Sequence, residues 1–325
     1  MKHKLGLTIW SYRIRWQQRR SAPGFPQWQS PLDVVDHCST LGSPALQTGI
    51  DGWSMELAQE VRNRCEEAGI ALEGQIELPG DLETFERSLL AGKAAGATIF
   101  RAYCSLERRY ERFTSRADWE RWQQDAIVTL HRIEPILARH QVKLAVENHK
   151  DWRAAEQAEV FRNLASEWIG ICLDFGNNLA LLEDPLAVAR TLAPWVISTH
   201  VKDMDLRSAP NGFLLSEVPM GTGVLDIAAL VEICRKANQD IRFFLEMITR
   251  DPLPIPCLTD TYRATFAEFT EHDLERTMDL ARRGDAAGLD LPYDNGLSDT
   301  EALELEDRLI RESLDWWRMS SVLGS

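Results

Sequence analysis

Four residues in the second half of the chain have side chains suited to metal-assisted chemistry, namely Glu147, Asp174, His200 and Glu246. Each stands at or near the end of a short apolar run, in the segments VKLAVEN, IGICLDF, WVISTHV and IRFFLEM. Three carboxylates and one imidazole form a set of oxygen and nitrogen ligands that suits Mn²⁺, Mg²⁺ or Co²⁺ better than a structural zinc ion. We therefore predict a metal-dependent enzyme with these four ligands, and Mn²⁺ as the first choice of ion.

The spacing of the four residues predicts that they converge. They are separated by 27, 26 and 46 positions, and one strand-plus-helix unit takes about 30 residues. Each apolar run therefore reads as one of four successive buried strands, the last interval being widened by a long loop over residues 210–223. In a closed barrel of parallel strands the carboxyl ends meet at one mouth, where active sites lie.

The rest of the chain supplies the elements that such a barrel needs. Helical periodicity of apolar residues fills the intervals, at residues 55–69, 81–96, 118–140 and 154–167. Short apolar runs predict strands at residues 4–10, 44–50, 70–78, 98–104, 142–148, 169–175, 195–201 and 241–247. Eight strands alternating with helices predict an α/β fold, a (β/α)₈ TIM barrel over residues 1–258 that carries the metal site.

The alternative α/β architecture is an open doubly wound sheet. That fold would show a glycine-rich phosphate turn between an early strand and its helix. The one glycine-spaced candidate, residues 220–223, follows the seventh predicted strand and reads as an ordinary loop leading into a helix near Asp226.

Residues 259–325 read as a helical C-terminal extension. A turn is predicted at residues 292–296, and a capping box from Ser298 to Glu301 begins the last helix. That helix has an apolar stripe that we expect to pack against the barrel, formed by Leu303, Ile310, Leu314 and Trp317. Trp316 adds aromatic surface, so contact with a second copy or a partner subunit through these helices is the alternative.

Composition excludes several classes of protein. The 325 residues include 50 acidic and 36 basic side chains, a net charge of −14 that gives no footprint for nucleic acid. We also expect no membrane partner, because no apolar stretch approaches the roughly 20 residues needed to span a bilayer and the N-terminus lacks a secretory signal. Six scattered cysteines without a CxxC pair indicate free, buried thiols, which predicts a cytoplasmic location.

Further site residues follow from strand geometry, because side chains two positions apart share a face. His149 should accompany Glu147, either as a catalytic base or as a partner that orients it. Lys202 should accompany His200 as a substrate contact, or else pair with a neighbouring aspartate at the surface. Other candidate substrate contacts lie at the ends of the first, third and fourth predicted strands, namely Trp10, Gln75 (or Glu77) and Arg101.

If a sugar chelates the ion through a carbonyl and an adjacent hydroxyl, the ion acts as a Lewis acid that stabilises the enediolate formed when the α-proton leaves. One glutamate, Glu147 or Glu246, removes that proton and the other returns it. Return to the opposite face gives epimerisation, and return to the neighbouring carbon gives isomerisation. Loss of a β-substituent from the same enediolate gives elimination, and spacing alone does not choose among the three.

Over residues 1–258 the chain resembles the xylose isomerase-like TIM barrels of the sugar phosphate isomerase/epimerase superfamily. The resemblance is carried by the segments VENH, LDFGN, HVKD and FLEM. That superfamily includes ketose 3-epimerases, hydroxypyruvate isomerases and inosose dehydratases. The resemblance implies a metal-dependent isomerase or epimerase of a keto sugar, with the four residues above as ligands and Glu147 and Glu246 as the acid/base pair.

Two departures concern the reaction. Ketose 3-epimerases have a substrate-holding histidine three positions after the strand-six aspartate, where this chain has Asn177 as the candidate contact. His149 resembles the base of C-glycoside deglycosidase barrel subunits, which implies the alternative of a lyase that eliminates a β-substituent from a 3-oxo sugar or glycoside. Because no cluster of arginine and lysine is evident in the late barrel loops, we expect a neutral or oxidised sugar.

Two other functional classes predict different features. An endonuclease-like phosphodiesterase on the same barrel would need several histidines for a multi-metal cluster, whereas only His149 and His200 stand at predicted strand ends. A non-catalytic sugar- or metal-binding barrel would have no use for two opposed glutamates. We therefore place both below the keto-sugar enzyme.

Overall fold

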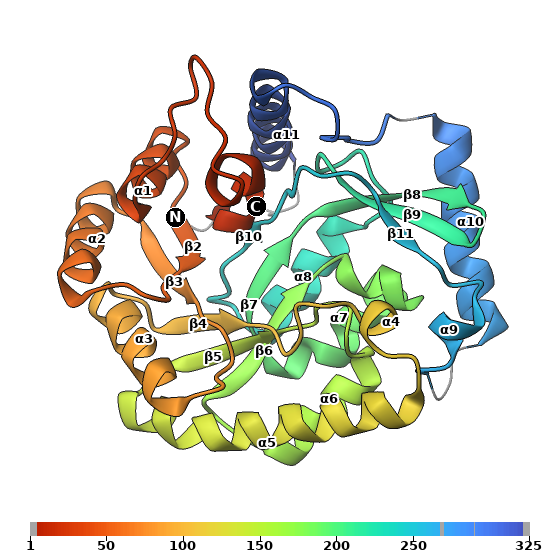
Figure 1. Ribbon diagram of the computed structural model, residues 1–325, viewed down its shortest axis with the longest axis horizontal. Helices are drawn as coiled ribbons and strands as arrows, with labels where there is room; N and C mark the ends of the chain where they lie inside the picture. The colour runs from red at the N-terminus through yellow and green to blue at the C-terminus, as the bar shows by residue number, and fades with distance from the viewer. Residues whose placement is uncertain (1–4, 267–269, 289, 321–325) are drawn as a thin grey trace.

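A closed barrel of eight parallel strands forms the centre of the computed structural model, which describes residues 5–266, 270–288 and 290–320 (Figure 1). Around the barrel the strands follow the order β1, β10, β7, β6, β5, β4, β3 and β2, so the predicted (β/α)₈ architecture is confirmed. Their bounds are β1 (Gly6–Thr8), β2 (Ala45–Gly49), β3 (Ala71–Gln75), β4 (Ile99–Ala102), β5 (Lys143–Glu147), β6 (Ile169–Asp174), β7 (Val196–Val201) and β10 (Phe244–Leu245).

Helices cover the outside of this barrel, with α5 along its lower edge in Figure 1. The caps follow the sequence: the Ser54 and Asp81 side chains accept hydrogen bonds from the backbone of Leu57 and Thr84 and begin α2 and α3. The helices of this layer are α1 (Pro31–Thr40), α2 (Met55–Ala68), α3 (Leu82–Ala94), α5 (Arg116–His140), α6 (Ala154–Leu164), α7 (Pro185–Leu192) and α8 (Ile227–Ala237). Shorter turns are η1 (Ile9–Tyr12), η2 (Arg13–Gln17), α4 (Arg109–Arg112), η3 (Asn177–Leu181) and η4 (Ala193–Trp195).

The register of the last strands positions the candidate ligands side by side. Asp174 of β6 pairs with His200 of β7, and His200 pairs with Phe244 of β10. Glu246 follows β10 directly and donates its backbone N–H to the Val201 carbonyl at 2.9 Å. Paired residues of neighbouring parallel strands project to the same side, so these side chains lie together at the mouth formed by the carboxyl ends of the strands.

The prediction of a loop over residues 210–223 is wrong for its first half. Residues Asp203–Ala209 (β8) and Gly212–Val218 (β9) form an antiparallel hairpin, which β11 (Leu253–Ile255) extends to three strands. Gly212 permits the close approach of β11, since a Cβ there would lie 2.2 Å from the Ile255 carbonyl oxygen. The remainder, through residues 220–223, is the predicted loop leading to α8, whose N-cap is Asp226.

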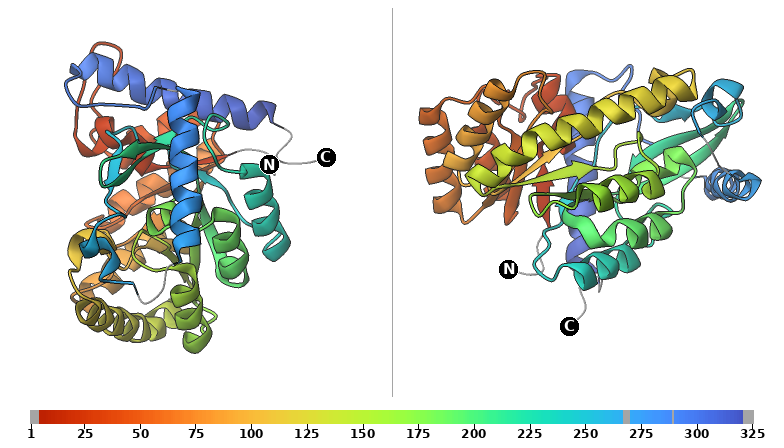
Figure 2. Two further views of the ribbon diagram at one scale, coloured as in Figure 1. Left: turned by 90° about the vertical axis from the view of Figure 1, so that its right-hand side faces the viewer. Right: turned by 90° about the horizontal axis from the view of Figure 1, so that it is seen from below.

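Three further helices follow, α9 (Asp260–Arg263), α10 (Glu271–Ala287) and α11 (Asp299–Met319). Helix α10 lies along the β8–β9 hairpin, as Figure 2 shows, and Leu274 and Ala281 share a core with Phe213. Helix α11 begins at the predicted capping box, and Trp317 packs against Phe243 with ring centroids 5.8 Å apart. The apolar stripe therefore packs against the barrel as predicted.

The half-buried Trp316 lies over Gly221, where a Cβ would come within 1.9 Å of the indole nitrogen. Contact with another subunit through α11 stays a prediction, as does the division of the chain at residue 258. In the part of the chain that the structure describes, no helix combines the length and apolar character needed to cross a bilayer.

Candidate metal centre

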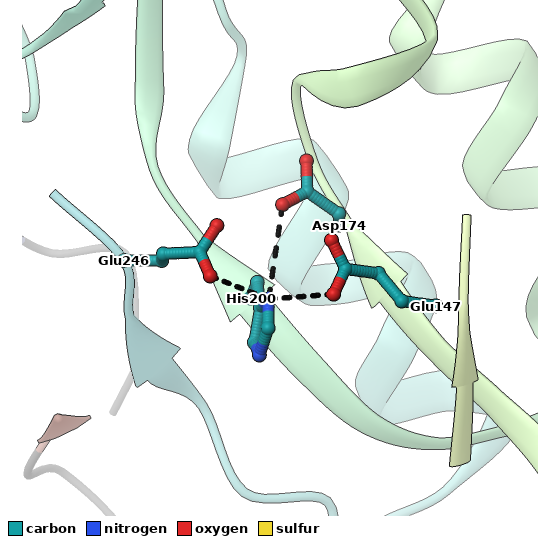
Figure 3. Close-up of side chains that lie close together, drawn as sticks. All are labelled: Glu147, Asp174, His200 and Glu246. Atoms are coloured by element: carbon teal, nitrogen blue, oxygen red, sulfur yellow. Dashed lines mark ion pairs between the residues drawn. The ribbon is translucent and has the colours of Figure 1, made fainter. Parts of the chain in front are cut away.

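The structure gathers the four candidate ligands at the carboxyl end of the barrel. Glu147 ends β5, Asp174 ends β6, His200 lies in β7 and Glu246 follows β10, and all four are buried. One ligand atom from each lies within 4.8 Å of the others. His200 Nδ1 lies 3.1 Å from Glu246 Oε1, 3.4 Å from Glu147 Oε2 and 3.9 Å from Asp174 Oδ2 (Figure 3).

The tautomer of His200 suits a metal ligand. Its Nε2 lies 2.7 Å from Gln47 Oε1, an acceptor, so Nε2 carries the hydrogen and Nδ1 of the neutral ring presents a lone pair to the carboxylates. Among the described residues, His200 Nδ1 is buried without a hydrogen-bond partner, and it faces Asp174 Oδ2, which contacts the Lys202 ammonium at 2.7 Å. A buried lone pair among carboxylate oxygens is stabilised by a proton or a cation, so these residues fit a divalent ion.

The pKa of His200 also indicates that this cluster favours a positive charge. Burial opposes a charged imidazole, but the Cys172 thiol and the Glu246 and Glu147 carboxylates raise the pKa of His200 well above its ordinary value. Either a proton or a metal ion offsets the negative charge that the three carboxylates concentrate here.

Glu147 is held as a carboxylate by two side chains. Arg101 donates from Nε to Glu147 Oε2 at 2.5 Å, and Asn177 donates from Nδ2 to Oε1 at 2.8 Å. Burial alone would raise the pKa of Glu147, but the charges of Arg101 and His200 hold it below the ordinary value. The inward-pointing cation predicted at residue 101 therefore has an acidic partner, Glu147. Asn177, predicted as a substrate contact, forms a hydrogen bond with the same candidate metal ligand.

Lys202 points into the site, so the alternative of a surface ion pair is wrong. Its Nζ lies 2.7 Å from Asp174 Oδ2 and also contacts Glu246, and only 1% of its side chain is exposed. Burial alone would raise the pKa of Glu246, but the charges of His200 and Lys202 lower it well below its ordinary value. Two cations, Arg101 and Lys202, thus offset two of the three carboxylates.

The remaining predicted residues separate into two groups. His149 and Trp10 line the cavity above the four ligands, and the His149 Nδ1–H donates to the Ser105 carbonyl at 2.9 Å. Burial lowers the pKa of His149 to about 3, so the imidazole stays neutral. Gln75 lies behind the site instead, where its amide donates to Gln47 Oε1 at 3.0 Å, and Glu77 is exposed.

Sequence reasoning missed several residues of the site. Gln47 holds His200 from across the barrel, a contact that no local pattern indicates. The cavity, of about 160 Å³, has six cationic side chains among its lining residues, namely Arg13, Arg101, Arg108, Lys150, Lys202 and Arg250. They come from separate parts of the chain, and the fold brings them together. The expectation of a neutral or oxidised sugar considered only the late barrel loops, where no such cluster is evident.

Comparisons with known proteins follow the same fold. The sequence profile of the xylose isomerase-like TIM barrel family matches residues 35–267. A 3-oxo-isoapionate decarboxylase of Pectobacterium atrosepticum is 30% identical over 126 residues, which span 38% of this chain and 46% of that protein. The match thus spans a little less than half the length of that relative.

Two solved structures illustrate the likeness in fold. A D-psicose 3-epimerase with D-tagatose from Clostridium cellulolyticum has a TM-score of 0.57 and 13% identity, over 86% of this chain and 99% of that one. A xylose isomerase-like barrel from Mycobacterium smegmatis in complex with magnesium has a TM-score of 0.55 and 13% identity, over 86% and 97% of the two chains.

Proposed function

Because this chain belongs to the xylose isomerase-like TIM barrel family, we propose that it is a divalent-metal-dependent isomerase or epimerase of a keto sugar. One observation carries the proposal: Glu147 and Glu246 approach a common centre from opposite sides of His200 (Figure 3). Their nearest oxygens lie 3.4 and 3.1 Å from the same nitrogen, so a substrate carbon above that centre has a carboxylate on each side.

Glu147, Asp174, His200 and Glu246 would hold the ion, with Mn²⁺ as the first choice and Mg²⁺ or Co²⁺ as alternatives. When bound, a divalent ion supplies Lewis-acid polarisation of the substrate carbonyl. A hard set of three carboxylates and one imidazole favours these ions.

The proton transfer uses the two glutamates. One carboxylate removes the proton from the carbon next to the carbonyl, and the electron pair moves onto the carbonyl oxygen. The opposite glutamate, after taking a proton from solvent, gives it to the other face for epimerisation or to the neighbouring carbon for isomerisation, and the first glutamate releases its proton to solvent. Arg101 keeps Glu147 ionised at the start, and Lys202 does the same for Glu246.

A carbon–carbon lyase acting on a keto sugar acid is the second candidate. The bond between the carboxylate carbon and the α-carbon of a 3-oxo acid breaks, its electron pair moves to the carbonyl oxygen, carbon dioxide leaves, and a glutamic acid protonates the α-carbon. Two observations favour it: the relative named as a 3-oxo-isoapionate decarboxylase and the cationic lining of the cavity. The same four ligands and the same glutamates serve both reactions.

Solvent exchange tests the proposal. The Mn²⁺-loaded protein is incubated in D₂O with a panel of ketoses and keto sugar acids, and NMR follows deuterium at the carbon next to the carbonyl. We expect exchange with at least one member of the panel, together with its epimer or isomer. A panel without exchange would overturn the isomerase proposal, and carbon dioxide released from 3-oxo sugar acids would assign the lyase.

A further inference from the structure

Lys150 differs from every other cation of the cavity. Only 3% of the residue is exposed, it lines the cavity, and its Nζ donates to the amide oxygen of Asn177. Among the described residues no carboxylate forms an ion pair with it, although each of the other five cations has one. A buried ammonium without an acidic partner pays a desolvation penalty that an anionic ligand would offset.

The backbone turns Lys150 toward the cavity. Alternation along a strand would direct it away from the face of Glu147 and His149, but its φ of +55° places it in the left-handed region. The turn is held by Arg109, whose N–H donates to the Lys150 carbonyl at 3.0 Å, and by Asp151, whose side chain accepts from the backbone of His149. A non-glycine residue in this conformation costs about 1 kcal/mol or more, which the contacts of Arg109 and Asp151 offset.

The surrounding charges favour an anion. With a divalent ion in place, the three ligand carboxylates are balanced by that ion together with Arg101 and Lys202, leaving one positive charge in excess. Arg250 is neutralised by Glu217, which it contacts through Nε at 3.1 Å. Burial and the charges of Lys202 and Arg250 lower the pKa of Lys150 to about 8, so the amine is mainly protonated at neutral pH. Its charge therefore adds to the excess.

We propose that Lys150 binds a carboxylate of the substrate, and that the substrate class is a keto sugar acid rather than a neutral keto sugar. This inference rests on the proposed function and specifies its substrate. A single ammonium in a cavity of about 160 Å³ matches one monoanionic carboxylate, whereas a phosphate dianion is more often bound by several donors at once.

The same contacts relate the anion to the reacting carbon. Lys150 contacts Asn177 Oδ1, and the Asn177 amide donates to Glu147 Oε1 at 2.8 Å. One asparagine side chain therefore separates the cation from the glutamate that exchanges the proton. A carboxylate held by Lys150 places the adjacent carbons of the substrate beside Glu147.

Binding of unreactive analogues tests the proposal. D-gluconate and D-glucitol differ only in a carboxylate against a hydroxymethyl group, and D-glucitol 6-phosphate supplies a phosphate. Calorimetry with the Mn²⁺-loaded wild type should show D-gluconate binding about 10- to 100-fold more tightly than D-glucitol. In Lys150→Met this preference should disappear, while Lys143→Met, at the exposed start of β5, should keep it.

A purely positioning role makes a different prediction. If Lys150 only holds Asn177, then Lys150→Met weakens D-gluconate and D-glucitol equally, and that result overturns the inference. Lys150→Arg, which keeps the charge, should retain most of the preference. Tighter binding of D-glucitol 6-phosphate than of D-gluconate, lost in Lys150→Met, would also overturn it, because the anion would then be a phosphate.

Failure of this inference is distinguishable from failure of the proposed function. Deuterium exchange into neutral ketoses without any preference for D-gluconate leaves the keto-sugar enzyme and removes the anion site. A Lys150-dependent preference for D-gluconate, without exchange into any ketose or keto acid, leaves the anion site and removes the isomerase.

Discussion

At the scale of single residues, the hydrogen bond from His200 to Gln47 decides which imidazole nitrogen faces the carboxylates. The 2.7 Å contact fixes Nε2 as the donor and leaves Nδ1 for the ion. We predict that Gln47→Leu lowers Mn²⁺ affinity about 10- to 100-fold, the usual effect of removing a partner that orients a ligand. Calorimetry measures this change, and an unaltered affinity in a folded variant would contradict it.

The two glutamates should differ from other acidic residues in their effect on exchange. We predict that Glu147→Gln and Glu246→Gln each lower the rate of α-deuterium exchange by about 10²- to 10⁴-fold, because the amide neither accepts nor donates the transferred proton. Glu77→Gln, an exposed change near the end of β3, is the matched control and should exchange at the wild-type rate. NMR measures all three, and equal rates would remove the glutamates from the mechanism.

Some residues of the site could be predicted from local sequence patterns, and others could not. The convergence of Glu147, Asp174, His200 and Glu246 was predictable because each stands at or near the end of an apolar strand, and barrel topology brings strand ends together. Lys150 was not, since its left-handed backbone conformation breaks the alternation that the strand pattern implies. The contact between Gln47 and His200 spans 153 positions of the chain, and no periodicity reports on it.

At the scale of elements, the β8–β9–β11 sheet supports one wall of the cavity through an ion pair. Arg250 reaches Glu217 on β9, whose side chain is only 1% exposed. We predict that Arg250→Met destabilises the protein by about 3 kcal/mol, because it removes the hydrogen-bonded partner of a buried carboxylate and leaves it with the more distant Lys202, at 3.9 Å. Urea unfolding measures the loss. The double variant Arg250→Met/Glu217→Gln should recover much of it, and additive losses would contradict the account.

Helix α11 holds η2 through a buried carboxylate. Glu306 Oε1 accepts from the Ile14 N–H at 2.6 Å and Oε2 from the Arg15 N–H at 3.2 Å, next to Arg13 in the cavity wall. Burial nevertheless raises the pKa of Glu306 to about 8, far above the unfolded value of about 4.3. Between these values the folded state binds the extra proton, so stability falls as the pH rises.

Comparison with Glu306→Gln isolates that effect. Between pH 5.5 and 8, wild type should lose up to about 3 kcal/mol of unfolding free energy relative to the variant, whose amide does not titrate. Urea unfolding across this range measures the difference, and other titrating groups cancel because both proteins have them. Parallel pH profiles would show that Glu306 does not titrate in this window.

Helices and strands could be predicted where the apolar residues follow a single helical or strand periodicity. Eight buried strands and the amphipathic helices around them have strong local patterns, and the structure confirms them. The β8–β9 hairpin was missed because the Pro-Asn-Gly run at residues 210–212 reads as a loop, while the strands on either side are recognisable only from their packing. Phe213 and Leu215 are buried by α10 and β11, which come later in the chain.

At the scale of the whole molecule, the sign of the net charge differs from that of most charged side chains lining the cavity. The chain carries a net charge of −14, yet six cations line the space above four buried ligands. Net charge alone therefore does not report the charge that a substrate meets. The distribution of charge becomes visible only once the barrel brings distant loops together.

Binding of the ion should stabilise the whole fold, because only the folded chain presents the four ligands together. At a Mn²⁺ concentration 100 times Kd the gain is about 2.7 kcal/mol, which corresponds to several degrees in Tm. We predict that a chelator lowers Tm by this amount and that added Mn²⁺ restores it. Asp174→Asn is the control and should respond little to either. A Tm that ignores chelator and ion alike would contradict the site.

The central claim is that one divalent ion sits among the last four strand ends of the barrel. Crystals grown with Mn²⁺ and measured for anomalous diffraction test it most directly. The account predicts one strong peak per chain, about 2.0 to 2.5 Å from one atom each of Glu147, Asp174, His200 and Glu246. A map with no peak there, or with its peak away from these side chains, would contradict it.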